Sequence, residues 1–241
     1  MTKPEAVIFD WGGTLSDYAA VELADMWHLA AEHLAPHMPE DEATLIRRFG
    51  RIEEEFWART TTDQRSGTLA DLLAAATSEL GVDIAEEMME EAAVRYLDAW
   101  TPHIVHDPEA APTLAALRER SLKIGLLSNT HWPRAFHERF LERDGLAELI
   151  DVRLYTSEMP VMKPHPDAFR AALAAVGLKD GERAVFVGDR PLDDISGAQG
   201  VGMRAVLRPN ALVSSYEVTP NATITGLPEL LPLIDGWLNE G

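Results

Sequence analysis

The chain of 241 residues is 46% hydrophobic, enough for a sizeable core, and its length favours a main domain with a smaller insertion. Forty acidic residues against 21 Lys and Arg give a net charge of −19, which repels phosphate backbones and acidic membrane surfaces, so we expect neither nucleic-acid nor membrane partners. The lack of cysteine excludes disulfides and thiolate chemistry, and no signal peptide or membrane-length apolar run is recognisable, so we expect a soluble cytoplasmic protein.

The first predicted element is a strand near the N-terminus. Residues 6–9 are all apolar without alternation, which is typical of a strand covered on both faces in a parallel sheet. The run stops at Asp10, and Gly12 and Gly13 follow as a turn that lets a ligand approach the main chain. Asp10 is therefore expected at the carboxyl end of a strand, where open α/β sheets bind ligands.

From about residue 16 to residue 100 the periodicity is helical. We expect an all-helical insertion over residues 17–100, ended by Pro102, and a main domain formed by residues 1–16 and 101–241. Its aromatic residues are expected to form the insertion's own core: Trp27, Phe56, Trp57, Tyr96 and Trp100. One or two of them are expected to face a ligand pocket. The acidic cluster 53–55 and the arginines at 47, 48 and 51 are expected to face solvent, although the arginines are also candidates for binding a substrate carboxylate.

Strands and helices then alternate to the end of the chain. Helices are expected over residues 111–120, 134–144, 166–176, 195–200 and 227–238, and strands over 122–127, 150–155, 184–187 and 203–207, the last taken as the final strand. This order is typical of an α/β protein with a doubly wound parallel sheet.

Several of these strands end in residues suited to chemistry. The set consists of Asp10 with Thr14, Ser128 with Asn129, Asp189 with Asp193 and Asp194, and Lys163 in a loop after the third strand. Strand ends on one edge converge, so these side chains are expected in one pocket. Facing carboxylates repel each other unless a cation lies between them, and Mg²⁺ suits oxygen ligands. A small phosphorylated metabolite is the expected substrate.

Four motifs carry a resemblance to a known family. The segments FDWGGTLSD, LLSNT, KPHPDAF and VGDRPLDDISGAQGVGM occur in the order found in the haloacid dehalogenase superfamily, which the chain resembles over almost its whole length. The resemblance implies a Rossmann-like core with strand order 5-4-1-2-3 and a helical cap inserted after the first strand. It also implies a hydrolase that works as a monomer or homodimer.

The resemblance also assigns roles to individual residues. Asp10 becomes the nucleophile that accepts a phosphoryl group, and Lys163 and Ser128 bind the transferring group. Mg²⁺ is held by Asp10, Asp189, the Gly12 carbonyl and Asp194, with Asp193 as a weaker candidate for the last position. Thr14, Asn129 and Gly13 are the remaining substrate-binding candidates. These roles agree with covalent catalysis aided by a cation.

One position departs from the family's phosphatases. The first motif of these phosphatases usually reads DxDGT, and its second Asp protonates the leaving group. This chain has Gly12 at that position. Such acid–base help contributes ~10²–10⁴ in rate. Asp17, His28 and His131 are candidates to supply the acid from elsewhere in the chain. Each also has a structural interpretation: Asp17 as a helix cap, His28 as a residue on the cap face, and His131 as a loop residue.

Relatives that lack this Asp give alternatives. Phosphonoacetaldehyde hydrolases use a cap lysine, but this chain has no lysine between Ser16 and Leu122. 2-Haloacid dehalogenases need no leaving-group acid, yet they use no metal, and the Gly188-Asp189 motif favours a metal. The third alternative is a catalytically weak protein that binds a ligand or partner through its cap.

Overall fold

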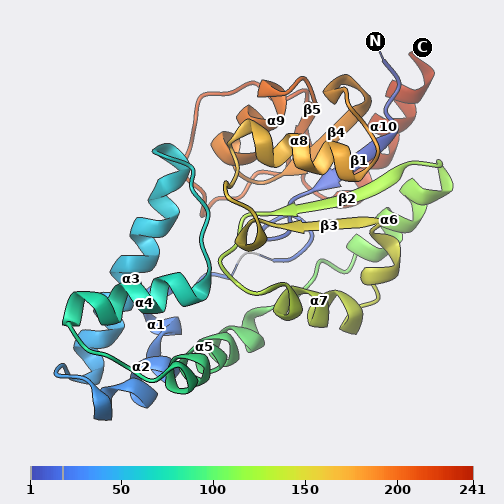
Figure 1. Ribbon diagram of the computed structural model, residues 1–241. Coiled ribbons are helices and arrows are strands. Elements are labelled where there is room, and N and C mark those ends of the chain that lie inside the picture. Colours follow the sequence, from blue (N-terminus) through green and yellow to red (C-terminus); the bar gives the residue numbers. More distant parts are fainter. Residues whose placement is uncertain (1, 18, 241) are drawn as a thin grey trace.

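The computed structural model describes residues 2–17 and 19–240, and at its centre lies a parallel sheet of six strands in the order β3-β2-β1-β4-β5-β6 (Figure 1). The strands are β1 (Ala6–Phe9), β2 (Lys123–Ser128), β3 (Val152–Tyr155), β4 (Ala184–Gly188), β5 (Arg204–Leu207) and β6 (Ala222–Thr223). The expected order 5-4-1-2-3 is thus confirmed and extended by one edge strand. The expectation that β5 is the last strand is wrong, because β6 has two residues, too few for a periodic signal.

Helices cover both faces of the sheet. Val7 and Phe9 pack toward α6 (Ala110–Glu119), α7 (Arg134–Arg143) and α10 (Leu230–Asn239). Ala6 and Ile8, which point to the opposite face, pack toward α8 (Pro166–Ala175) and α9 (Gly197–Gly200). This alternation explains why β1 is apolar at every position. A π-helical turn, η7 (Pro191–Ser196), precedes α9 and holds the last acidic motif.

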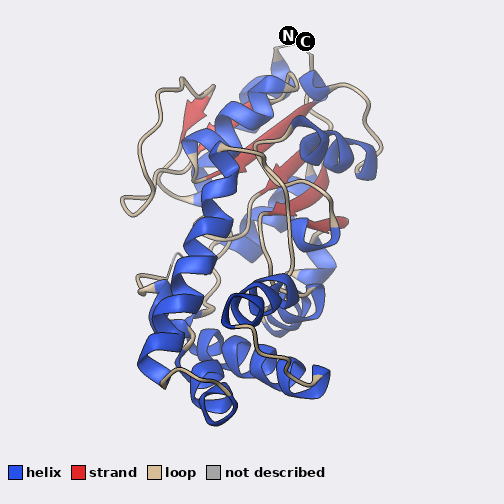
Figure 2. Ribbon diagram, turned by 60° about the vertical axis from the view of Figure 1, so that its left-hand side comes forward, coloured by secondary structure: helices blue, strands red, loops and turns tan. Residues whose placement is uncertain are grey.

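The residues between β1 and α6 form a block of helices, which we call the helical block. It contains α1 (Leu23–Met26), α2 (His28–Leu34), α3 (Glu42–Ala58), α4 (Leu69–Leu80) and α5 (Glu86–Trp100). Figure 1 shows it beside the sheet, and Figure 2 shows both termini together at the other end of the molecule. None of the helices in the described ranges has the length and apolar character needed to cross a membrane.

The helical block has its own aromatic core. The Trp27 ring lies 4.7 Å from Phe49 and 4.0 Å from Tyr96, between centroids, and Phe56 is 2% exposed. Thr68 and Asp71 form a capping box at the start of α4. The block is thus a packed unit and presents a fixed surface toward the sheet.

Candidate active site

Three neighbouring strands deliver polar residues to one edge of the sheet. β1 pairs in parallel with both β2 and β4. Asp10 follows β1, Ser128 ends β2, and Asp189 follows β4. All three residues are at least 95% buried. The convergence expected from the sequence is therefore present.

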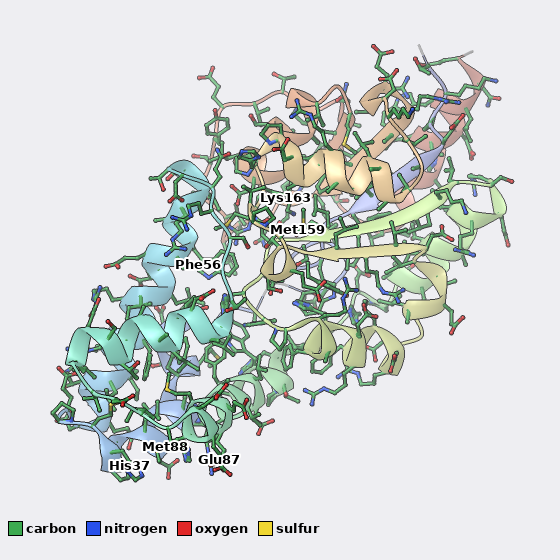
Figure 3. The ribbon with its side chains drawn as sticks, viewed as in Figure 1. His37, Phe56, Glu87, Met88, Met159 and Lys163 are labelled. Carbon is green, nitrogen blue, oxygen red and sulfur yellow. The ribbon has the colours of Figure 1, made fainter. Side chains whose placement is uncertain are left out.

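Lys163 joins two of the carboxylates at this edge. Its Nζ donates to Asp10 Oδ1 and to Asp194 Oδ1, each over 2.6 Å, and the side chain is 1% exposed. Figure 3 shows Lys163 at the end of the sheet that faces the helical block. Burial raises the pKa of Asp10 to about 6, and Lys163 only partly offsets this effect. Burial also disfavours the charged lysine, but Asp10 and Asp194 outweigh it and hold the pKa of Lys163 above its usual value.

Asp189 completes a group of three carboxylates. Oxygens of Asp10, Asp189 and Asp194 lie within 4.8 Å of one another, and all three residues are buried. Asp189 Oδ2 accepts from Asn210 over 3.0 Å, whereas Oδ1 is buried without a partner. Burial and the charges of Asp10 and Asp194 raise the pKa of Asp189 to about 8. A buried, repelling carboxylate group with an orphaned oxygen fits a hard divalent cation such as Mg²⁺.

The two glycines after Asp10 differ in the space around them. Gly13 has φ +79°, and a Cβ there would lie 2.2 Å from Asp189 Oδ2, so glycine is required. A Cβ at Gly12 would meet nothing within 4 Å, and Gly12 lines the cavity described below. Gly12 therefore cannot act as an acid, although the structure has room for an acidic side chain at this position.

The predicted substrate-binding residues have different surroundings. Ser128 lines the cavity, and its hydroxyl makes only a long contact of 3.5 Å with the Asn129 carbonyl. The Asn129 amide is engaged with the Lys163 backbone, donating to its carbonyl over 2.9 Å and accepting from its N–H over 2.8 Å. Asn129 therefore orients the lysine. Thr14 Oγ1 is buried without a partner and lies outside the cavity lining.

The neighbouring aspartates Asp193 and Asp194 contact different residues. Asp194 contacts Lys163 and belongs to the group of three carboxylates. Asp193 lines the cavity and lies 3.6 Å from the Arg190 guanidinium. Burial raises the pKa of Asp193 to about 6. The π-helical turn η7 directs these two successive carboxylates to different partners, which favours Asp194 for the metal position.

A cavity of about 370 Å³ opens from this edge toward the helical block. Asp10, Lys163 and Ser128 lie at its sheet end, while Glu53 and Leu23 come from the block. Four tryptophans from both parts of the chain also line it: Trp11, Trp57, Trp100 and Trp132. The expectation that one or two of the block's aromatic residues face a pocket is met by Trp57 and Trp100. Trp11 and Trp132 were not expected there.

Glu53 is the main surprise of the site. The expectation that it faces solvent is wrong, because it is 1% exposed. Its carboxyl accepts from Trp27 Nε1 over 2.8 Å, from the Tyr96 hydroxyl over 2.9 Å and from Trp57 Nε1 over 3.4 Å. Burial raises the pKa of Glu53 to about 7. A signal existed, since Phe49, Glu53 and Trp57 repeat every four residues on the apolar face of α3.

His131 faces Glu53 from the loop after β2. Its Nε2 lies 3.1 Å from the Tyr96 hydroxyl and 3.6 Å from Glu53 Oε1, and its Nδ1 is buried without a partner. Burial lowers the pKa of His131 to about 3, so the ring is neutral near pH 7. A neutral imidazole is a poor proton donor, which argues against His131 as the borrowed acid.

The other candidates for the acid, and the arginines considered for binding a substrate carboxylate, lie in different parts of the structure. His28 is exposed, pairs with the Asp25 carbonyl over 2.7 Å and lies outside the cavity lining. Asp17 is exposed at the cavity wall. Of the arginines considered for a substrate carboxylate, Arg48 and Arg51 bind glutamates of the block, and Arg47 donates to Thr44. None of the three lines the cavity.

Known proteins share this sequence and architecture. A family model described as haloacid dehalogenase-like hydrolase matches residues 4–202. The phosphoserine phosphatase of Thermus thermophilus is 37% identical over 128 residues, which cover 51% of this chain and 49% of that protein. The chain thus matches about half the length of that relative.

Two further matches span nearly the whole chain. A phosphatase of Mycobacterium tuberculosis is 27% identical over 239 residues, covering 96% of this chain and 97% of that protein. The structure of a 2-haloacid dehalogenase from Pseudomonas syringae superposes with a TM-score of 0.72 at 26% identity, covering 97% of this chain and 99% of the other. Similar proteins therefore include both phosphatases and dehalogenases.

Proposed function

The chain belongs to the haloacid dehalogenase-like hydrolase family, and we propose that it is a Mg²⁺-dependent phosphohydrolase of small phosphorylated metabolites, with Asp10 as nucleophile. The observation that carries the proposal is the buried arrangement in which Lys163 lies 2.6 Å from both Asp10 and Asp194 beside Asp189. Three buried carboxylates outnumber the one lysine, so the site retains negative charge that a metal would offset.

The first chemical step forms a bond between a carboxylate oxygen of Asp10 and phosphorus while the bond from phosphorus to the leaving-group oxygen breaks. Water then attacks phosphorus, which frees Asp10 and releases inorganic phosphate. The Lys163 ammonium offsets negative charge on Asp10 and on the phosphoryl oxygens, and Ser128 is placed to donate a hydrogen bond to the transferring group. Leaving-group protonation is the weak step, because Gly12 carries no acid.

The residues that would hold Mg²⁺ are Asp10, Asp189 and Asp194, together with the carbonyl of Gly12. When bound, Mg²⁺ would supply charge stabilisation between the nucleophile and the phosphoryl oxygens. Thr14 and Gly13 are proposed to shape the loop that receives the phosphoryl group. Asn129 is proposed to act by orienting Lys163.

The helical block is proposed to act as a cap over residues 1–16 and 101–241. Its residues 17–100 contribute Glu53, Trp57 and Trp100 to the same cavity that holds Asp10. A substrate phosphorylated at one end would thus meet the core with its phosphoryl group and the cap with its leaving group.

Dehalogenation is the second candidate. The Pseudomonas syringae structure favours it, as does Gly12, because a halide leaves without a proton. The charged residues of the cavity favour phosphoryl transfer instead, because the described residues of the helical block add no lysine or arginine to its lining that could bind the carboxylate of a 2-haloacid. Among the described residues, the lysine and arginine that line the cavity are Lys163 and Arg190, both beside aspartates, and neither comes from the helical block.

The test measures phosphate release from acetyl phosphate, aryl and alkyl phosphates, and halide release from 2-haloacids, with Mg²⁺ and with EDTA. We expect metal-dependent phosphate release, fastest on acyl and aryl phosphates because their leaving groups need no acid. Asp10→Asn should abolish it, with Asp83→Asn, an exposed position, as the matched control. Metal-independent halide release would establish the dehalogenase, and no turnover would favour a binding protein.

A further inference from the structure

Part of the cavity lining consists of tryptophan rings set at angles to one another. Trp132 lies 5.0 Å from Trp100 with the ring planes at 56°, and 6.1 Å from Trp11 at 81°, between centroids. These three rings all border the cavity. Trp57 adds a fourth ring from α3. Aromatic rings bind cations through their negative faces.

A buried carboxyl without a cationic partner lines the same cavity. The groups that donate to Glu53 are the neutral Trp27, Trp57 and Tyr96 side chains, and His131 beside it is uncharged near pH 7. No lysine or arginine within the described ranges forms an ion pair with Glu53. A buried carboxylate held by neutral donors retains attraction for a positive charge.

Beyond Glu53, Asp10 and Lys163, the charged residues of the cavity lining are two aspartates and Arg190, which lies 3.6 Å from Asp193. The two aspartates are Asp17 and Asp193, and the helical block adds no lysine or arginine to the described lining. An anionic leaving group would meet the carboxylates of Asp17 and Glu53, which form no ion pair with a lysine or arginine among the described residues. A cationic leaving group would be attracted by them and by the net charge of −19.

We propose that the cavity binds a phosphomonoester of an amino alcohol, with its ammonium group packed against Trp57, Trp100 and Trp132 and paired with the Glu53 carboxylate. The inference rests on the proposed phosphohydrolase function and specifies its substrate class by affinity, because these alkyl esters still turn over slowly without an acid at position 12. A cavity of about 370 Å³ accommodates a phosphoryl group together with a small ammonium head group. Glu53 thereby determines specificity and takes no part in bond breaking.

The binding experiment compares two ligands of nearly equal shape that differ in charge. Choline carries a quaternary ammonium, and 3,3-dimethylbutanol has a neutral carbon in its place. Titration of the full-length protein, followed by calorimetry and tryptophan fluorescence, should show choline binding at least tenfold more tightly. Equal affinities would overturn the inference. This comparison uses the unmodified protein, so it does not depend on whether a variant folds.

A substitution then assigns the preference to Glu53. Glu53→Gln removes the charge and keeps the size, so the choline preference should fall to about onefold, whereas Glu54→Gln, exposed on the same helix, should keep it. A preference retained in Glu53→Gln would overturn the role of Glu53.

Kinetics separate this inference from the proposed function. With Mg²⁺, KM for phosphocholine should be at least tenfold below KM for 3,3-dimethylbutyl phosphate, and phosphoserine should be the poorest of the three. Turnover of acetyl phosphate with no preference for phosphocholine would sink the substrate class and leave the phosphohydrolase intact. No turnover of acetyl phosphate would refute the phosphohydrolase, and the choline titration would still decide whether the cavity binds cations.

Discussion

Lys163 Nζ lies 2.6 Å from Asp10 Oδ1, although the two residues are 153 positions apart and almost fully buried. The same ammonium also binds Asp194, so one positive charge serves two carboxylates. A third carboxylate, Asp189, has no such partner for its Oδ1. Lys163 thus supplies one positive charge to the three carboxylates. The negative charge that it leaves unpaired favours the binding of a metal ion.

Lys163→Met should therefore impair both stability and turnover. Removing the cation leaves two buried carboxylates unpaired, which costs ~3–5 kcal/mol in the free energy of unfolding. Loss of the ammonium should lower kcat on acetyl phosphate by ~10²–10³. Urea unfolding and phosphate release would measure the two effects, with the exposed Lys179→Met as control. Unchanged kcat would show that the lysine is structural only.

Gly12→Asp should restore the missing acid. A Cβ at position 12 would meet nothing within 4 Å and Gly12 lines the cavity, so the carboxyl can be accommodated. Turnover of alkyl phosphates should rise by ~10²–10³, because their leaving groups need a proton, while acetyl phosphate should gain little. Gly13→Ala is the matched control and should lose activity, since its Cβ would collide with Asp189. Equal or lower rates on alkyl phosphates in Gly12→Asp would show that the cavity is shaped for other chemistry.

Mg²⁺ should stabilise the protein through Asp189. A ligand at a hundredfold excess over Kd adds ~2.7 kcal/mol, which corresponds to a rise in Tm of roughly 5–10 °C for a chain of this size. Asp189→Asn should lose most of this rise, and in EDTA it should melt above wild type because one buried, repelling carboxylate is gone. Differential scanning calorimetry against NaCl of equal ionic strength measures both. An identical Mg²⁺ effect in Asp189→Asn, with Asp83→Asn as reference, would contradict the assignment.

The sheet and the polar strand ends could be predicted because their signals are local. Residues 6–9 are apolar at every position since both faces of β1 are covered, and Asp10 breaks the run where the strand stops. Parallel order then brings Asp10, Ser128 and Asp189 together without further information. The two-residue strand β6 had no such signal.

The cavity wall could not be predicted because its contacts are distant in sequence. Glu53 belongs to an acidic run that usually faces solvent, and its donors Trp27 and Tyr96 lie 26 and 43 positions away. The bonds between the Asn129 amide and the Lys163 backbone, 34 positions away, could not be predicted either, and substrate binding by Asn129 stays a prediction. Residue type alone did not distinguish these uses.

The raised pKa of Glu53 predicts a pH effect on stability. Its pKa is about 7 in the folded state and near the usual value of 4.5 when unfolded, so its contribution to stability is present below pH 4.5 and is lost as pH rises through 7, by about 3 kcal/mol. The facing groups, neutral His131 and the Tyr96 hydroxyl, do not titrate in this window. Urea unfolding of wild type and Glu53→Gln from pH 5 to 8 should show the wild-type advantage shrinking with pH. A pH-independent difference, as expected for Glu54→Gln, would contradict this titration.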